Sequence, residues 1–382
     1  MTMPAKARDT RLDVLRAIAL LMIFVDHVPG QPLENWTLRN FGFSDASEIF
    51  VLISGIAVAL AYGRKYDMTN LTDLTRKAWR RAGTLFGAHL FATFATIAVF
   101  GVFALAATRP FLMRQIDMWP ALSDPARGVF ALVTLGHQIG YNNILPMYMV
   151  LMLMVPAIIW AERRSPVLLL AVSIALWAIA GTWRIGPPRM LEPGIWFFNP
   201  LSWQLIFVIG YVGMRHVSRG RKLGGNPVLF AVALAYLVFA CVWIVDGLGA
   251  RNDLTFGLPY VLTGSDKTFL TGWRLLHVLA MTYVFISLPA VSNLVRLPLA
   301  NPLSVIGRHG LSIFVAGTLL SVAAQAAMMV AGNNVLFSLA LIAAGVQVQI
   351  ALAYVLDWRD ARKPAVKRPG TPVGPSTVLI SG

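Results

Sequence analysis

Residues 11–30 read RLDVLRAIALLMIFVDHVPG, and residues 44–63 read SDASEIFVLISGIAVALAYG. Both stretches are apolar enough for membrane helices, yet they contain ionisable side chains. These residues are Asp13, Arg16, Asp26, His27 and Glu48. Ionisable groups are costly in hydrocarbon, and where they occur they usually serve a function. The two stretches therefore predict membrane helices that carry a functional site.

The spacing of the charges predicts a polar face on the first of these helices. A helix turns about 100° per residue, so the step from Arg16 to His27 ends about 20° from where it began. Asp13 lies within about 40° of the same line, whereas Asp26 does not. Arg16 and His27 are roughly 16 Å apart along the axis, about half the thickness of a hydrocarbon core. This face suggests a polar path into the membrane.

The composition of the 382-residue chain indicates a polytopic membrane protein. Hydrophobic residues make up 57% of the chain and charged residues 13%, about half the charged fraction of a soluble protein. The formal net charge of +15 does not indicate a nucleic-acid partner, because the basic residues lie in short loops between apolar spans. The single cysteine, Cys241, excludes an intrachain disulfide.

We expect an all-α fold, a polytopic integral membrane helical bundle of about ten transmembrane helices. The expected spans are 12–29, 47–63, 82–107, 141–161, 166–183, 197–214, 227–246, 270–292, 303–330 and 333–356. The ninth is long enough to bend, and Gly307 and Gly310 lie where the bend would fall. We expect a membrane domain over residues 1–358 and a basic, disordered tail over residues 359–382.

The distribution of Lys and Arg predicts the orientation of the bundle. With the N-terminus in the cytoplasm, the cytoplasmic segments hold most of the 32 Lys and Arg residues. This is the asymmetry that the positive-inside rule describes, so both termini are predicted to be cytoplasmic. Arg16 then lies near the inner face of the membrane and His27 near the outer face.

The ionisable residues of the first two spans each have a functional and a structural interpretation. His27 can act as a general base, or its ring can simply hydrogen-bond to a neighbouring helix. Glu48 can orient that ring as the carboxylate of a triad does, or it can form a capping box with Asp45. Arg16 can bind an anion, or it can pair with Asp13 one turn away. The sequence leaves these alternatives open.

Later spans carry further polar candidates. Arg80 and Arg81 can bind a phosphate-rich ligand, or they can act as topology determinants. Other polar residues can bind an anionic or sugar ligand or serve as contacts between helices; these are Gln204, Lys267, Arg274, His277, Arg308 and His309. No phosphate-binding loop, zinc pattern or serine nucleophile elbow is present, so we expect no metal. A transporter and a membrane-embedded transferase both fit this pattern.

The chain resembles the membrane acyltransferase-3 superfamily. Arg16 and His27 match its signature of Arg, ten residues and His, and residues 48–55, EIFVLISG, resemble its acidic–x–Phe–Phe–x–x–Ser–Gly motif with Val51 at the second Phe. Arg80 and Arg81 fall where the superfamily has an arginine pair. More closely, the chain is similar to the OpgC family, succinyltransferases of osmoregulated periplasmic glucans. The similar segments are RLD at 11–13, GFSDA at 42–46, ILPMY at 144–148, NPLSWQ at 199–204, RLLH at 274–277 and, for the superfamily, IGRHGLS at 306–312.

The resemblance implies an O-acyltransferase of the bacterial inner membrane. It would move an acyl group, expected to be succinyl, from cytoplasmic acyl-CoA (succinyl-CoA) to hydroxyls of a periplasmic glucan, with membrane lipids around it. The alternatives are an acetyltransferase on another polysaccharide, a carrier for an anion or sugar, and a structural partner in a polysaccharide-export complex.

The resemblance also implies roles for particular residues. His27 would be the general base and Glu48 its orienting carboxylate, while Arg16, Arg80 and Arg81 would hold the phosphates of the donor. A succinyl carboxylate in low dielectric needs a cationic partner. The candidates for that partner are Arg274, His277 and Arg308. The candidate oxyanion donors are Ser54, Gln204 and Arg308, and the remaining substrate-binding candidates are Asp13, Lys267 and His309. Whether an acyl-histidine intermediate forms stays open, as does the oligomeric state.

Overall fold

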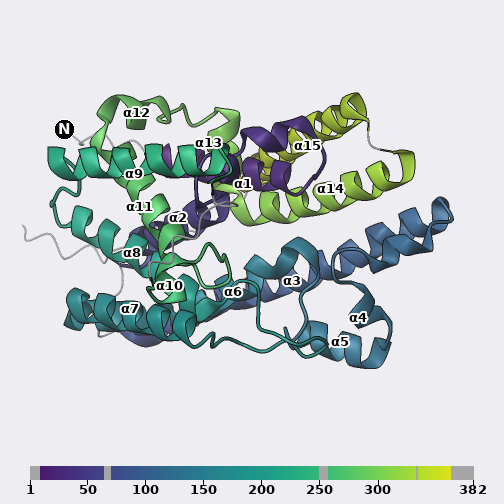
Figure 1. Ribbon diagram of the computed structural model, residues 1–382, viewed down its shortest axis with the longest axis horizontal. Coiled ribbons are helices and arrows are strands. Elements are labelled where there is room, and N and C mark those ends of the chain that lie inside the picture. The colour runs from purple at the N-terminus through teal and green to yellow at the C-terminus, as the bar shows by residue number, and fades with distance from the viewer. Residues whose placement is uncertain (1–8, 64–69, 249–256, 333, 363–382) are drawn as a thin grey trace, which may run out of the picture.

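The fold is built from helices, as expected (Figure 1). The computed structural model describes residues 9–63, 70–248, 257–332 and 334–362. Within these ranges no β-strand occurs, and the pairing of Pro188 with Ile195 is an isolated bridge. The prediction of an all-α fold is therefore confirmed.

In the described residues, ten long helices pack into a bundle. They are α1 (Arg11–Asp26), α2 (Ala46–Ala61), α3 (Leu71–Ala106), α6 (Ile144–Arg164), α7 (Pro166–Thr182), α8 (Pro200–Ser218), α9 (Pro227–Val245), α11 (Gly272–Ser287), α14 (Gly310–Ala331) and α15 (Val335–Ala361). Shorter helices connect them, namely η1 (Pro32–Trp36), η2 (Leu38–Asn40), η4 (Pro110–Arg114), α4 (Trp119–Leu122), α5 (Pro125–Val133), η5 (Gly140–Asn143), α10 (Tyr260–Thr263), α12 (Pro289–Leu294) and α13 (Pro302–Arg308). Each of the ten predicted spans falls on one or two of these helices.

Five helices of the described chain are long and apolar enough to cross a membrane. They are Leu71–Ala106, Gly140–Arg164, Pro227–Val245, Gly310–Ala331 and Val335–Ala361. The helices α2 and α7 are apolar but shorter. Such lengths of apolar helix are typical of membrane proteins and not of soluble domains, so the chain is a membrane protein.

Several boundaries differ from the predicted ones. The helix α3 begins at Leu71, well before residue 82. Its first turns are amphipathic, so the helix extends beyond the apolar segment from which the span was predicted. The eighth span divides at Leu288, since Pro289 begins α12. The ninth span breaks at His309, between the two glycines at which the bend was predicted. The helix α15 continues to Ala361, three residues into the predicted tail, and residues 363–382 lie outside the described residues.

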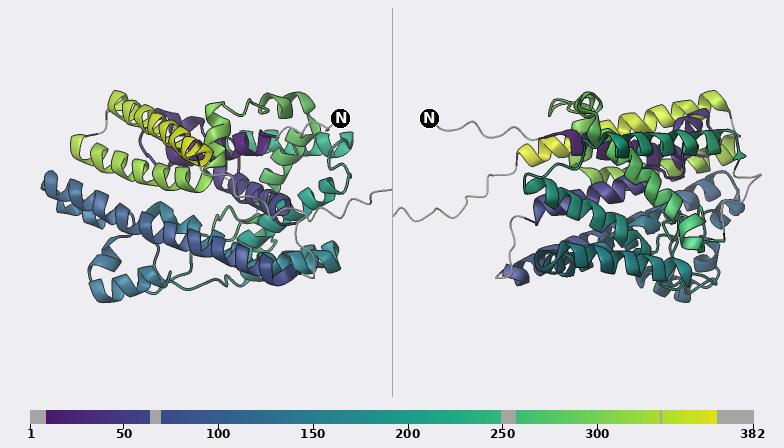
Figure 2. Two further views of the ribbon diagram at one scale, coloured as in Figure 1. Left: turned by 180° about the vertical axis from the view of Figure 1, so that it is seen from behind. Right: turned by 60° about the vertical axis from the view of Figure 1, so that its left-hand side comes forward.

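The helix α1 packs against α2, α13 and α14 (Figures 1 and 2). A β-carbon placed on Gly307 of α13 would lie 1.8 Å from the backbone oxygen of Asp13 in α1. No side chain fits at that separation, so glycine is required for α13 to touch the backbone of α1. This contact brings the break in the ninth span next to the charged face of α1.

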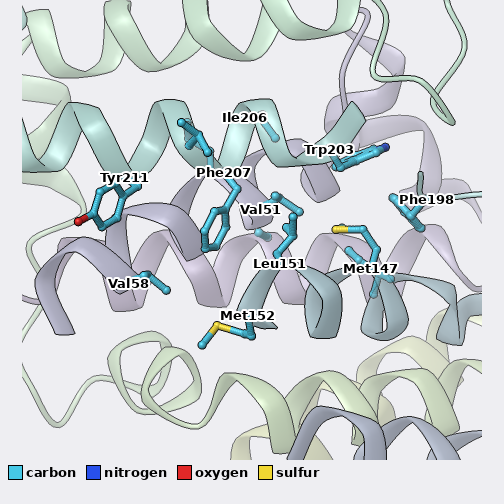
Figure 3. Close-up of a cluster of buried hydrophobic side chains, with 14 of the residues drawn as sticks. Val51, Val58, Met147, Leu151, Met152, Phe198, Trp203, Ile206, Phe207 and Tyr211 are labelled. Carbon is cyan, nitrogen blue, oxygen red and sulfur yellow. The ribbon is translucent and has the colours of Figure 1, made fainter. Parts of the chain in front are cut away.

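A dense apolar core holds α2, α6 and α8 together (Figure 3). Trp203 and Phe207 of α8 are fully buried. Phe207 points toward Val51 of α2 and Leu151 of α6, while Trp203 lies against Phe198. The indole nitrogen of Trp203 donates to the backbone oxygen of Lys267 at 3.0 Å. Because interiors of this kind are closely packed, α2 offers a rigid support for the polar groups at its ends.

Candidate functional site

His27 caps the C-terminal end of α1. Its ring stacks on Tyr141, with ring centroids 3.8 Å apart and an interplanar angle of 16°. The ring also lines a crevice too narrow to admit water, together with Phe314 and Thr318 of α14. Its Nδ1 atom is buried and has no hydrogen-bond partner among the described residues. His27 is therefore a confined imidazole with unused hydrogen-bonding capacity.

Glu48 is fully buried at the start of α2, and both of its oxygens have partners other than His27. One accepts a hydrogen bond from the backbone N–H of Asp45 at 2.9 Å, while the Asp45 side chain accepts from Ser47 N–H at 2.8 Å. This is the capping box that the sequence allowed. The other oxygen accepts from Nε of Arg274 at 2.7 Å. The structure thus pairs Glu48 with Arg274 instead of with the His27 ring.

Lys267 and Asp45 extend this pair into a cluster of balanced charge. The Nζ atom of Lys267 lies 2.5 Å from a carboxylate oxygen of Asp45, and Arg274 lies 3.2 Å from the same oxygen. Two cations and two carboxylates thus neutralise one another in a largely buried place. The cluster joins the beginning of α2 to the beginning of α11, and it leaves little free positive charge for a substrate.

His277 is also engaged. Its Nδ1 lies 2.7 Å from the hydroxyl of Ser44, and its ring covers the backbone of Gly42. Arg274 and His277 lie at the same end of α11, and each has partners at the beginning of α2 or on the segment that leads into it.

A second polar region lies in a cavity of about 470 Å³ beside the N-terminal half of α1. It brings together residues that are far apart in the sequence. The predicted site residues that line it are Arg16, Ser54, Arg81, Arg308 and His309. Other lining residues include Phe50, Tyr148, Ser312 and Phe314. Four basic side chains from α1, α3 and the break between α13 and α14 therefore surround one space.

The basic side chains of the cavity differ in how they are compensated. Arg16 donates to the backbone oxygen of Gly307 at 2.9 Å and lies 3.4 Å from Asp13. Arg308 lies 3.1 Å from Asp357 of α15. Arg81 has no ion pair within the described residues. An anion entering the cavity can therefore meet Arg81 without displacing a carboxylate.

His309, at the junction of the two helices, shares this acidic partner. Its Nε2 lies 3.5 Å from the Asp357 carboxylate. Its Nδ1 lies 3.9 Å from Asp360. Acidic residues of the last turns of α15 thus face both basic residues of the junction.

Two further sequence candidates, Arg80 and Gln204, also lie outside the cavity. Arg80 is exposed and does not line it, because neighbouring helical residues point about 100° apart. The side-chain amide of Gln204 donates to the backbone oxygens of Ser173 at 2.8 Å and Leu201 at 3.2 Å. That amide is a contact between α8 and α7, whereas the Ser54 hydroxyl, which donates to Phe50 O at 2.8 Å, is at the cavity wall.

Phe314 lies between the two polar regions, since it lines both the cavity and the His27 crevice. Its ring stacks on Phe50 at a centroid distance of 6.4 Å. Phe314 is therefore part of the wall of both the basic cavity and the His27 crevice.

Sequence reasoning missed Tyr141, Phe314 and Gln325, which surround His27. Gln325 carried a usable signal, because it is a buried amide inside an otherwise apolar helix and such a group needs a partner. The aromatic residues carried none, since such residues are common in membrane helices and at their ends. No group of three or more His, Cys, Asp or Glu that could hold a metal occurs in the part of the chain that the structure describes.

Comparison with known proteins gives the family. The sequence matches the family described as OpgC protein over residues 8–361. The chain belongs to the OpgC family. Searches among curated proteins and among solved structures gave no match. Membership of the OpgC family indicates a glucan-modifying acyltransferase, and the match covers the basic cavity, His27 and the Arg274 cluster.

Proposed function

We propose that this OpgC-family protein is an O-acyltransferase of the bacterial inner membrane that moves a succinyl group from cytoplasmic succinyl-CoA to hydroxyls of a periplasmic glucan. The observation that carries the proposal is the cavity that Arg16, Arg81, Arg308 and His309 surround. Guanidinium groups bind phosphate oxygens through paired, charge-assisted hydrogen bonds. A coenzyme A donor carries several phosphates, so this cavity suits its nucleotide end.

The proposed orientation follows from the positive-inside rule, with ten spans and both termini in the cytoplasm. The cavity then belongs to the cytoplasmic half of the protein, and His27 belongs to the periplasmic half. The donor would enter from the side where acyl-CoA is made, and the glucan would approach from the side where it accumulates.

The proposed reaction needs a base at the far end of the donor arm. His27 takes the proton of a sugar hydroxyl while the hydroxyl oxygen forms a bond to the thioester carbon. The carbon–sulfur bond then breaks, and the leaving thiolate takes the proton from the imidazolium. Ser54 and Arg308 line the cavity and stay candidates for oxyanion stabilisation, whereas Gln204 is engaged elsewhere.

The succinyl carboxylate also needs a cation. Of the three candidates from the sequence, Arg274 is bound to Glu48 and His277 to Ser44. Arg308 lies 3.1 Å from Asp357 and lines the cavity that we assign to the phosphates. The cation that meets the succinyl carboxylate therefore stays open among these three.

A vesicle experiment tests the reaction, the acyl group and the use of donor and acceptor from opposite sides of the membrane. Neutral glucan and succinyl-CoA are added outside sealed right-side-out membrane vesicles that contain the protein. We expect no product until detergent opens the vesicles, and then free thiol and a glucan that binds an anion-exchange column until mild alkaline ester cleavage. Vesicles that contain no protein are the control.

Each contrary outcome has a distinct meaning. Product from sealed vesicles would show that donor and acceptor are both taken from the outer side, which would contradict the proposed transfer across the membrane. Esterified glucan that forms from acetyl-CoA but not from succinyl-CoA, and stays neutral, would show an acetyltransferase. An open system that yields neither thiol nor ester would favour the carrier, which would instead move solute across sealed vesicles.

Arg81 provides a test of the donor site. Arg81→Gln should raise the KM for succinyl-CoA about tenfold or more, because a lost hydrogen bond to a charged group costs roughly 1.5–3 kcal/mol. The matched control is Arg80→Gln, since Arg80 is the neighbouring arginine but is exposed and outside the cavity. Equal effects of the two substitutions on KM would contradict the assignment of the cavity as the site that binds succinyl-CoA.

A further inference from the structure

We propose that Tyr141 and Gln325 form a clamp that positions His27 for proton transfer. The inference rests on the proposed acyl transfer, in which His27 is the base. The three residues are far apart in the sequence and come from η5, α14 and the end of α1 (Figure 1). Both clamp residues are positioning residues, because they act on the reaction through the histidine.

Gln325 holds the backbone of His27. Its Nε2 donates to the backbone oxygen of His27 at 2.5 Å and to the hydroxyl of Tyr141 at 3.0 Å. A backbone oxygen can only accept, which fixes the nitrogen of the side-chain amide on this side. The last carbonyl groups of a helix have no partner within it. One buried amide therefore secures both the end of α1 and the residue that stacks on the imidazole.

Tyr141 holds the ring of His27. The two rings are nearly parallel at 3.8 Å between centroids, so the stacking restricts rotation of the imidazole about its side-chain bonds. Tyr141 is itself fixed by the turn before it. Gly140 has a φ of +53°, a conformation that glycine adopts without strain, and its N–H donates to Ile116 O at 3.0 Å.

The acidic residues near this end of α1 are committed to other groups. Asp26 accepts from the Thr37 hydroxyl at 2.6 Å and lies 3.5 Å from Arg39. Asp45 and Glu48 belong to the cluster with Lys267 and Arg274. A catalytic histidine usually has a third group that orients it. Here the ring of Tyr141 acts as the orienting group. An aromatic face also favours a neighbouring cation, so it would stabilise the imidazolium formed in the reaction.

Steady-state kinetics of the purified protein with succinyl-CoA and glucan test the clamp. Tyr141→Leu should lower kcat on the order of tenfold or more, a part of the 10²–10⁴ that a positioned base contributes, and leave the donor KM unchanged. Tyr141→Phe keeps the ring and should retain most of kcat. Gln325→Met, which keeps the volume but loses both hydrogen bonds, should lower kcat in the same way. Thermal unfolding in detergent identifies any variant that fails to fold.

The outcomes separate the clamp from the proposed function. An unchanged kcat in Gln325→Met and in folded Tyr141→Leu, with His27→Ala inactive, would overturn the clamp and leave the acyl transfer intact. A raised donor KM with unchanged kcat would place these residues in the binding of the donor and also overturn it. Activity that survives His27→Ala would instead remove the mechanism on which the inference rests.

Discussion

Replacing His27 with alanine is expected to reduce acyl transfer by at least 10²-fold, the lower range for loss of a general base. The ring lies at the end of α1 in a narrow crevice, with a buried nitrogen that has no partner among the described residues. Removing it takes away the proton acceptor and the stacking contact with Tyr141, while the backbone contact of residue 27 with Gln325 is kept. The protein should therefore insert, purify and bind succinyl-CoA as before, and thiol release should be lost.

The matched control is His216→Ala. His216 is a half-buried histidine in the last turn of α8 and lies outside both the cavity and the crevice. Its replacement should leave turnover unchanged. Near-normal turnover in His27→Ala would make the ring structural and end its assignment as the base.

The second large effect concerns stability and the pair of Arg274 and Glu48. Arg274→Leu should destabilise the protein by about 3–5 kcal/mol, because it leaves a fully buried carboxylate without its partner. Glu48→Leu should have a similar cost, since it removes the capping box and leaves the guanidinium with Asp45 alone. Unfolding in detergent, followed with temperature or denaturant, measures both losses.

The double variant Glu48→Leu with Arg274→Leu decides the interpretation. If the two side chains mainly serve each other, its loss of stability should be much smaller than the sum of the single losses. Additive losses would contradict the pairing. A normal stability of both single variants, with loss of kcat alone, would return Glu48 to the role of an orienting group for His27.

The helices could be predicted from the sequence because their signal is local. Apolar runs of sufficient length define the spans, and the ten long helices fall on them. The boundaries were less accurate where polar and apolar residues alternate, as in the first turns of α3 from Leu71 onward. The bend near His309 was predictable because two glycines flank it.

The site was predictable only in part, and the reason is the distance over which its contacts form. Charged residues in apolar helices identified Arg16, Arg81 and Arg308 as candidates, and the fold brings them to one cavity. The resemblance implied that Glu48 orients His27. In the structure Glu48 accepts from Arg274, which lies 226 residues away in the sequence. Periodicity shows which residues share a face of one helix. It does not show which residues of another helix they contact. For the same reason it did not bring Tyr141 to His27.

The break between α13 and α14 places backbone, as well as side chains, at the basic cavity. Gly310, Leu311 and Ser312 form the first turn of α14 and line that cavity. The amide groups at the beginning of a helix lack partners within it, and the aligned peptide dipoles concentrate about half a positive charge there. An uninterrupted ninth helix would have no such terminus at this depth. Part of the attraction for an anion therefore comes from the backbone at the beginning of α14. This part persists when any single arginine is replaced.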